Sequence, residues 1–173
     1  MRGLPILVGA LFVFGCAVKP PDGWTEFVAK DAGFSVKLPC APGREVEEYP
    51  YKAGKRYGYK YSCDSNGIGY RITFGDHNPD TGESVQKFLE YSEGDLELAF
   101  KDSIKEKQEV QVDGFHGRMY LLHIDERKYL WTAIVSNNKG VLHVTLVPLS
   151  TPGAEKGSET FERVLSSVRF PSQ

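Results

Sequence analysis

Two histidines on predicted strands, His123 and His143, are the residues of this sequence that best suit acid–base chemistry. An imidazole that meets a serine, with an acid such as Asp125 behind it, could act as a general base for hydrolysis. The chain contains no GxSxG, HExxH, P-loop or dinucleotide fingerprint, and their absence excludes only those mechanisms. The alternative is that both imidazoles cover the sheet and make local hydrogen bonds. We expect this alternative, and therefore a protein that is not an enzyme and has no catalytic residue.

An oxygen-rich segment precedes the first predicted helix. Its polar residues are Asp76, His77, Asn78, Asp80 and Glu83. Carboxylates of Asp76, Asp80 and Glu83 could bind calcium or manganese, although the spacing does not fit an EF-hand. Turn formation and an acidic helix N-terminus explain the same residues without a ligand. We therefore predict no metal site and no cofactor.

The three cysteines give the chain an odd count. Cys16 follows Val13-Phe14-Gly15, which resembles a bacterial lipobox, so lipidation of Cys16 would account for the odd thiol. Cys40 and Cys63 then remain as a pair at the ends of predicted strands, in an oxidising compartment. We predict a disulfide between them, with free thiols or a two-thiol metal or redox site as the alternatives.

One predicted hairpin is both aromatic and basic. From residue 49 to residue 61 the chain has five of its nine tyrosines, four cations and no acid. These residues are Tyr49, Tyr51, Lys52, Lys55, Arg56, Tyr57, Tyr59, Lys60 and Tyr61. Such surfaces bind protein partners, glycans or anionic polymers through charge and stacking. The alternative is that alternate tyrosines fill one sheet face and the lysines are solvated. We take the hairpin as the candidate binding surface.

The composition describes one soluble domain with an N-terminal export signal. The 173 residues are 40% hydrophobic and 25% charged, with a net charge of −2, so non-specific binding of nucleic acid is not expected. The uncharged run from Gly3 to Gly15 is too short to span a bilayer and suits a signal peptide. We predict a signal peptide over residues 1–15, a lipidated N-terminus and tether over 16–23, and a domain over 24–173. The alternative is an ordinary secretory signal with a coincidental cysteine.

Hydrophobic periodicity predicts strands, a helix, further strands and a last helix. Period-two alternation and turn signals, including Asn66-Gly67, favour an antiparallel meander in the first half. The strands expected there are Trp24–Ala29, Gly33–Leu38, Arg44–Tyr51, Lys55–Ser62 and Gly69–Gly75.

Helical spacing in the second half begins at Gly82 and continues to Lys105. Its stripe runs from Val85 to Ser103 and leaves Glu93 off it, and Gly94 is a candidate kink or split. The strands that follow are Gly117–Ile124, Lys128–Val135 and Val141–Val147, apolar on both faces and so central. Ser158 is the expected cap of a last helix through Val168. The fold class is α+β, a largely antiparallel sheet with two main helices.

Three segments resemble bacterial envelope proteins of the PsbP-like α/β/α sandwich class. They are GFSVKLPCAP from Gly33, VDGFHGRMYLL from Val112 and FERVLSSVRF from Phe161. The resemblance covers residues 24–170 and departs from the pattern at His116, where a proline is common. It carries no catalytic residues and implies an assembly factor, adaptor or binding module.

These observations predict a lipid-anchored lipoprotein of the bacterial cell envelope that acts as a non-catalytic binding or assembly module. Ala17 after the lipidated cysteine favours the outer membrane, facing the periplasm, in a Gram-negative host. The expected partners are the membrane, through the lipid, and an envelope protein or anionic polymer. A periplasmic carrier of a small apolar ligand or metal is the second hypothesis, and a hydrolase is the third.

Overall fold

The computed structural model of the chain describes residues 23–51, 54–77, 84–125 and 128–171. Nine strands and three helices occupy these residues. The strands are β1 Thr25–Ala29, β2 Phe34–Leu38, β3 Gly43–Tyr51, β4 Gly54–Ser65, β5 Ile68–Asp76, β6 Ile104–Val112, β7 Phe115–Asp125, β8 Lys128–Asn137 and β9 Gly140–Pro148. The helices are α1 Val85–Phe100, α2 Thr151–Glu155 and α3 Gly157–Ser167.

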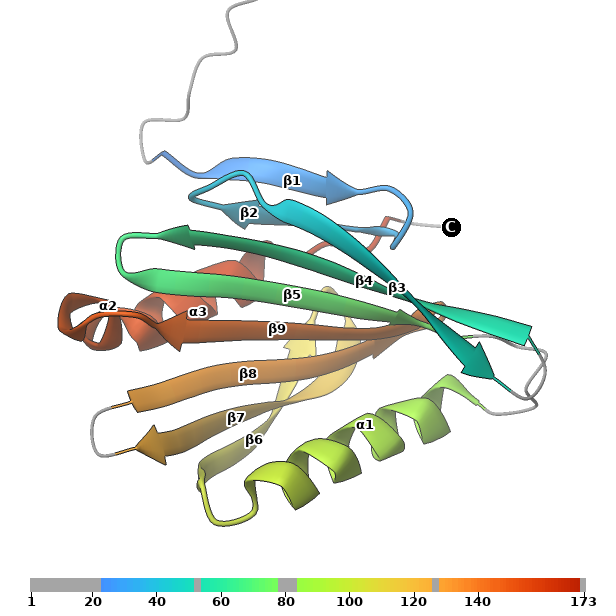
Figure 1. Cartoon of the computed structure of the whole chain (residues 1–173). Coiled ribbons are helices and arrows are strands. Elements are labelled where there is room, and N and C mark those ends of the chain that lie inside the picture. Colours follow the sequence, from blue (N-terminus) through green and yellow to red (C-terminus); the bar gives the residue numbers. More distant parts are fainter. Residues whose placement is uncertain (1–22, 52–53, 78–83, 126–127, 172–173) are drawn as a thin grey trace, which may run out of the picture.

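Seven of the strands form one antiparallel sheet in the order β3-β4-β5-β9-β8-β7-β6 (Figure 1). β1 and β2 form a separate antiparallel hairpin. The connection through α1 carries the chain from β5 to the far edge of the sheet, and β9 then returns to pair with β5. The strands before and after α1 therefore share one sheet, which confirms the predicted α+β class with its largely antiparallel sheet.

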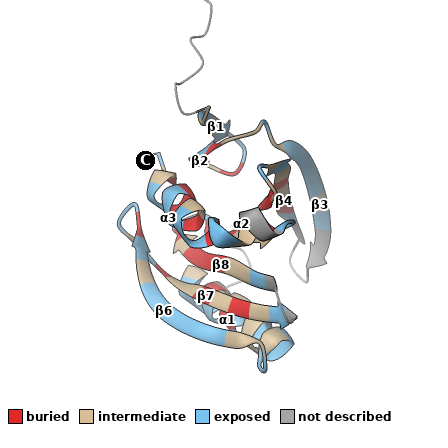
Figure 2. Cartoon of the chain, turned by 90° about the vertical axis from the view of Figure 1, so that its left-hand side faces the viewer, coloured by how far each residue is buried: buried red, intermediate tan, exposed pale blue. Residues whose placement is uncertain are grey.

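The sheet is covered on both faces, so the molecule has three layers. On one face, α1 packs Leu89 against Tyr120, Leu122 and Ile134. On the other face, β2 and α3 pack against β5, β8 and β9 around Phe34 and Phe161. Burial is highest in this second core, and β6 is mostly exposed (Figure 2). β8 and β9 are central and buried on both faces, as predicted.

The α1 prediction was right in position and wrong at its end. The helix is continuous through Gly94 and stops at Phe100, where the Ser103 N–H donates to the Phe100 carbonyl (2.8 Å). β6 then begins at Ile104, a strand that the periodicity did not reveal.

The predicted cap of the last helix was wrong. The capping residue is Ser150 and not Ser158: the Ser150 Oγ accepts a hydrogen bond from the Gly153 N–H (3.3 Å) at the start of the short helix α2. α3 follows directly, with Lys156 at its N-cap and no side-chain cap bond. Because α2 leads straight into α3, α3 begins without a side-chain cap.

Within the described ranges, no helix has the length and apolar character needed to cross a membrane.

Candidate binding surface

The predicted basic and aromatic hairpin is the β3–β4 pair. Its register aligns Gly43 with Ser62 and Tyr51 with Gly54. β5 pairs with β4 only from Gly58 onward, opposite Gly75. Among the described residues, positions 48–51 and 54–57 therefore pair only with one another. We call these eight residues the arm, which projects beyond the sheet in Figure 1.

Only some of the predicted surface residues can be placed. The side chains of Tyr49, Tyr51, Lys52, Lys55 and Arg56 lie outside the described part of the chain. Tyr57 lies on the arm and is 37% exposed, and Val46, just inside the arm on β3, is 44% exposed. Tyr59 is half-buried beside them, with the Arg44 guanidinium 5.8 Å from its ring centroid. The exposed apolar surface near the arm is thus made by Val46, Tyr57 and the edge of Tyr59.

Tyr61 does not belong to this surface, which corrects the sequence prediction. Its side chain is 1% exposed and packs against Phe27 and Phe34, with ring centroids 5.0 and 5.7 Å away. The hydroxyl donates to Asp31 Oδ1 (3.0 Å). Burial, followed by this hydrogen bond, raises the pKa of Tyr61 to about 12. Tyr61 is buried because the turn between β1 and β2 covers this part of the sheet.

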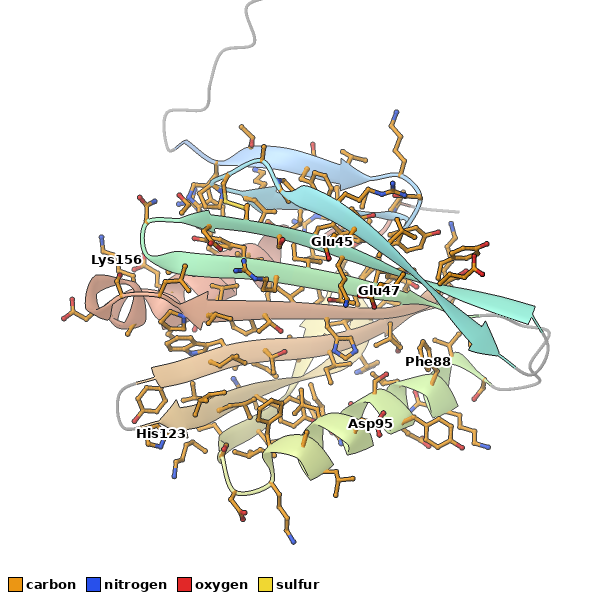
Figure 3. All side chains as sticks on the ribbon, in the orientation of Figure 1. Glu45, Glu47, Phe88, Asp95, His123 and Lys156 are labelled. Atoms are coloured by element: carbon orange, nitrogen blue, oxygen red, sulfur yellow. A yellow bond between two sulfur atoms is a disulfide. The ribbon has the colours of Figure 1, made fainter. Side chains whose placement is uncertain are left out.

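The charge of the β3–β4 hairpin is also more balanced than the composition of residues 49–61 indicates. Register places the glutamates of β3 opposite β4, with Glu45 facing Lys60 and Glu48 facing Tyr57. Lys60 forms an ion pair with Glu47, and Figure 3 labels Glu45 and Glu47 on this hairpin. Lys60 is therefore neutralised, and the excess positive charge of the hairpin comes from the cations nearer its tip.

The two histidines do not form one site. β8 lies between their strands, and it pairs His143 with Ile134 but His123 with Tyr129. Five residues of β8 separate these two levels, about 17 Å at ~3.4 Å per residue, and an odd separation places them on opposite faces. His123 contacts the Tyr129 ring (4.9 Å between centroids), and burial lowers the pKa of His143 to about 4. The fold therefore does not bring the two imidazoles together.

The oxygen-rich segment is described only in part. Asp76 ends β5 and the His77 N–H donates to the Lys139 carbonyl (2.8 Å), whereas Asn78, Asp80 and Glu83 lie outside the described residues. Over the residues that the structure describes, no group of three or more His, Cys, Asp or Glu side chains is placed to hold a metal ion.

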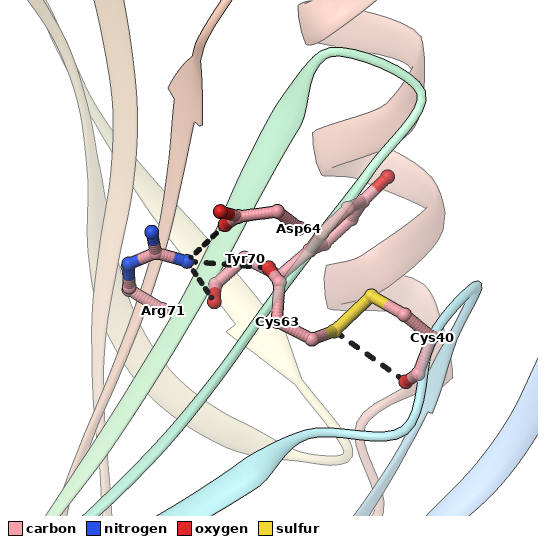
Figure 4. Close-up of a disulfide and its surroundings, with 5 residues drawn as sticks. All are labelled: Cys40, Cys63, Asp64, Tyr70 and Arg71. Carbon is pink, nitrogen blue, oxygen red and sulfur yellow. Dashed lines mark hydrogen bonds and ion pairs between the residues drawn. A yellow bond between two sulfur atoms is a disulfide. The ribbon is translucent and has the colours of Figure 1, made fainter.

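Cys40 and Cys63 form the predicted disulfide (Figure 4). It joins the segment after β2 to β4, and so fixes the β1–β2 hairpin to the sheet. Beside it, Arg71 Nη1 donates to Asp64 Oδ1 (2.7 Å) and to the Cys63 carbonyl (3.2 Å). These contacts hold β4 and β5 together next to the Asn66-Gly67 turn.

Sequence reasoning missed a charged cleft between α1 and the β6–β7 pair. The cleft has a volume of about 330 Å³, and its lining includes Glu90, Glu93, Glu109, His116 and Arg118. Glu93 is 8% exposed and accepts from Arg118 Nη1 (2.7 Å). Helical spacing could have revealed this position, because Glu93 lies four residues after Leu89 and three before Leu96. Among the described lining residues, the cleft offers the ion pair of Glu93 and Arg118.

Comparisons with known proteins show the fold alone. No family model matches the chain, and no curated protein matches its sequence. The cyanobacterial PsbP protein CyanoP from Synechocystis sp. PCC 6803 is similar in structure, with a TM-score of 0.56, 9% identity, and coverage of 91% of this chain and 96% of CyanoP. This similarity supports a PsbP-like fold.

Two other solved structures are similar to a lower degree. A Pseudomonas aeruginosa protein of unknown function has a TM-score of 0.45 and 14% identity over 86% of this chain and 99% of its own. A Bacteroides thetaiotaomicron protein has a TM-score of 0.46 and 13% identity over 87% of this chain, which spans half (50%) of that protein.

Proposed function

We propose that this chain is a lipid-anchored protein of the bacterial cell envelope that binds a partner through the arm and does not catalyse a reaction. The observation that carries the proposal is the arm itself, whose strands continue past the last pair that β4 makes with β5. Among the described residues, the two strands of the arm pair only with one another, and a two-stranded ribbon gains little stability alone. Its extension is therefore better explained by contact with a partner than by the needs of the fold.

The chemistry of the arm favours an anionic partner. Lys52, Lys55 and Arg56 supply positive charge near the tip, and Glu48 is the acid on the arm. Val46 and Tyr57 add exposed apolar area at its base. Aromatic rings beside cations are enriched at protein interfaces. We infer that the partner is an acidic envelope protein or an anionic envelope polymer.

Charge reversal tests the binding proposal. Lys55→Glu with Arg56→Glu should weaken the capture of envelope partners and lower its dependence on salt, because charge complementarity is lost. Lys101→Glu with Lys105→Glu, at exposed positions elsewhere, is the matched control and should leave capture unchanged. Equal capture by both double variants and by the unaltered protein would exclude the arm as the binding surface.

The anchor rests on the lipobox-like segment, which lies outside the described residues. Acylation of Cys16 after removal of residues 1–15 would hold the domain at the membrane by two or more acyl chains, which anchor stably where one chain does not. The proposed location is the outer membrane, on its periplasmic side. Cys16→Ser should release the folded domain in soluble form, and intact mass should show the loss of acyl chains. A variant that stays in the membrane fraction after a salt wash would refute this anchor.

A carrier function is the second candidate, because an apolar groove lies between β6–β7 and α3. The groove has a volume of about 350 Å³, and Val110, Val112, Met119 and Leu165 supply its apolar lining. Met119→Gln should then weaken the binding of an apolar fluorescent probe to the purified domain. Absence of probe binding by the unaltered domain would exclude the carrier function.

A further inference from the structure

Stretches of chain that are far apart in the sequence meet at one pocket near the end of the described chain. The pocket has a volume of about 410 Å³, and its lining includes Gly33, Asp113, Phe115, Asn137, Lys139 and Phe170. The three segments that resemble PsbP-like proteins each contribute to this lining, and the β8–β9 turn supplies the rest. Figure 1 shows the segment after α3 ending beside the β1–β2 turn. The volume lies within the range of small-molecule sites, about 300–1,000 Å³.

Hydrogen bonds and ring packing fix the walls of this pocket. The segment after α3 pairs with β2, because Ser35 and Arg169 exchange backbone hydrogen bonds (2.8 and 2.9 Å). The Phe170 N–H donates to Asp113 Oδ2 (2.7 Å). The rings of Phe115 and Phe170 pack edge to face, with 5.1 Å between centroids. Walls that are already held in place need little ordering when a ligand binds.

A buried amide in the lining has a donor without a protein partner. Asn137 is 7% exposed, and its Oδ1 accepts from the backbone N–H groups of Lys139 (2.8 Å) and Gly140 (2.9 Å). These two bonds hold the oxygen toward the β8–β9 turn and leave Nδ2 on the opposite side of the amide. Over the described residues, Nδ2 donates to no acceptor. Because an unpaired buried donor is unfavourable, an acceptor atom of a ligand in the pocket would stabilise it.

Two opposite charges line the same pocket without pairing with each other. The Lys139 side chain lies over Gly33, where an added Cβ would be 3.7 Å from Nζ. Asp113 uses Oδ2 to accept from the Phe170 N–H. Within the part of the chain that the structure describes, neither Lys139 nor Asp113 forms an ion pair. A ligand that carries one charge of each sign would complement both side chains.

We propose that this pocket binds a small zwitterion with an apolar body, for which a free aromatic α-amino acid is the simplest example. The carboxylate of the ligand accepts from Asn137 Nδ2 and Lys139 Nζ, and its ammonium faces Asp113. The apolar body packs against the edges of Phe115 and Phe170. The proposal depends neither on the arm nor on the lipid anchor.

A chemical-shift titration with three probes tests the class of ligand. The chain of residues 16–173 with Cys16→Ser keeps every described residue and is labelled with ¹⁵N. The probes are phenylalanine, 3-phenylpropionate, which lacks the ammonium, and 2-phenylethylamine, which lacks the carboxylate. Phenylalanine should shift the side-chain NH₂ resonance of Asn137, which is identified by its absence from the spectrum of Asn137→Asp. It should also bind several-fold more tightly than either truncated probe, because each of those loses a charged contact.

Substitutions in the pocket separate the contributions of its groups. Asn137→Asp keeps an oxygen for the two turn N–H groups but replaces the donor with a carboxylate oxygen, so it should abolish the binding of phenylalanine. Lys139→Gln should weaken the binding of phenylalanine and phenylpropionate and leave that of phenylethylamine unchanged. Asp113→Asn, whose amide oxygen can still accept from the Phe170 N–H, should weaken the binding of phenylalanine and phenylethylamine only.

Two controls lie outside the pocket. Lys105→Gln, at an exposed position on β6, and Met119→Gln, in the apolar groove, should leave the titration unchanged, and thermal unfolding checks the fold of every variant. Equal affinity for the three probes, an Asn137 resonance that phenylalanine does not shift, or unaltered binding in Asn137→Asp would overturn the proposed site. Loss of binding in a folded Met119→Gln variant would place the ligand in the groove and would overturn it as well.

Discussion

Glu93 and Glu97 lie one turn apart on α1 and meet opposite environments. Glu93 is buried, and desolvation raises the pKa of its carboxyl although Arg118 opposes that change. Glu97 accepts from Lys107 Nζ (2.5 Å) and from the Tyr120 hydroxyl (3.0 Å). The hydrogen bond from Lys107 is the main reason that the pKa of Glu97 falls below its usual value. One turn of α1 thus holds a carboxyl whose pKa is raised and another whose pKa is lowered.

These shifts predict opposite pH dependences. The folded state holds the Glu93 proton to a higher pH than the unfolded chain, so the contribution of Glu93 to the free energy of unfolding falls as pH rises above 4.5 through its raised pKa. The contribution of Glu97 is fully present above 4.5 and is lost as pH falls through its lowered pKa. Urea unfolding of Glu93→Gln and Glu97→Gln from about pH 3 to pH 8 measures both differences from the unaltered protein. Slopes of the same sign would contradict this account.

The disulfide supplies a second prediction at the scale of residues. Cys40 and Cys63 are 23 positions apart, and on the chain-entropy model a loop of this length contributes about 3 kcal/mol. Cys40→Ala with Cys63→Ala should lower the free energy of unfolding by about that amount. A reducing agent should lower the stability of the unaltered protein and leave the double variant unchanged. Two titratable thiols at these positions in the unfolded, unreduced protein would contradict the disulfide.

At the scale of elements, the segment GFHGR, from Gly114 in the β6–β7 turn to Arg118 on β7, shows why its glycines are needed. Gly114 has φ +83° and follows Asp113, at φ +51°, in the tight turn between β6 and β7. A Cβ on Gly117 would lie 2.3 Å from the Ile134 carbonyl oxygen of β8. Arg118 then reaches Glu93 on α1. This short motif therefore sets a turn, the spacing of two strands and the docking of a helix.

A matched pair of substitutions tests the roles of two glycines. Gly94 lies in the middle of α1 with no atom near its missing side chain, so Gly94→Ala should raise the free energy of unfolding by about 1 kcal/mol through helix propensity. Gly117→Ala should lower it by about 1–3 kcal/mol, because β8 must move to admit the methyl group. Denaturant unfolding of the two variants compares the signs, and a gain in stability at Gly117 would refute the close-packing argument.

Elements with a strong local signal could be predicted from the sequence, and those without one could not. Asn66 and Gly67 both adopt positive φ, at +52° and +73°, as the Asn-Gly hairpin signal requires. β6 escaped prediction because its sequence, IKEKQEVQV, is charged on both faces at the edge of the sheet. A strand's position at the edge is a property of the assembled sheet, so no local sequence pattern in β6 predicts it.

At the scale of the whole molecule, the layers could be predicted but the surfaces could not. Apolar strands such as β8 and β9 and the two amphipathic helices determine a sandwich. The position of the candidate binding surface depends instead on where β5 stops pairing with β4. Tyr57 and Tyr61 have the same residue type and lie on the same strand face, yet Tyr61 is under the β1–β2 turn and Tyr57 is beyond it. The position of the β1–β2 turn over the folded sheet therefore separates a core tyrosine from a surface one.

Site-specific cross-linking in intact cells tests the binding function most directly. A photoreactive amino acid at Tyr57, on the arm, is compared with the same residue at Tyr91, which is 50% exposed on the outer side of α1. The account predicts a discrete cross-linked species from position 57 that is absent from position 91. Adding Lys55→Glu and Arg56→Glu should remove it, and thermal unfolding of the purified variant checks that the loss of the cross-link is not a loss of the fold. No species from position 57, or the same species from both positions, would contradict the claim that the arm is the binding surface.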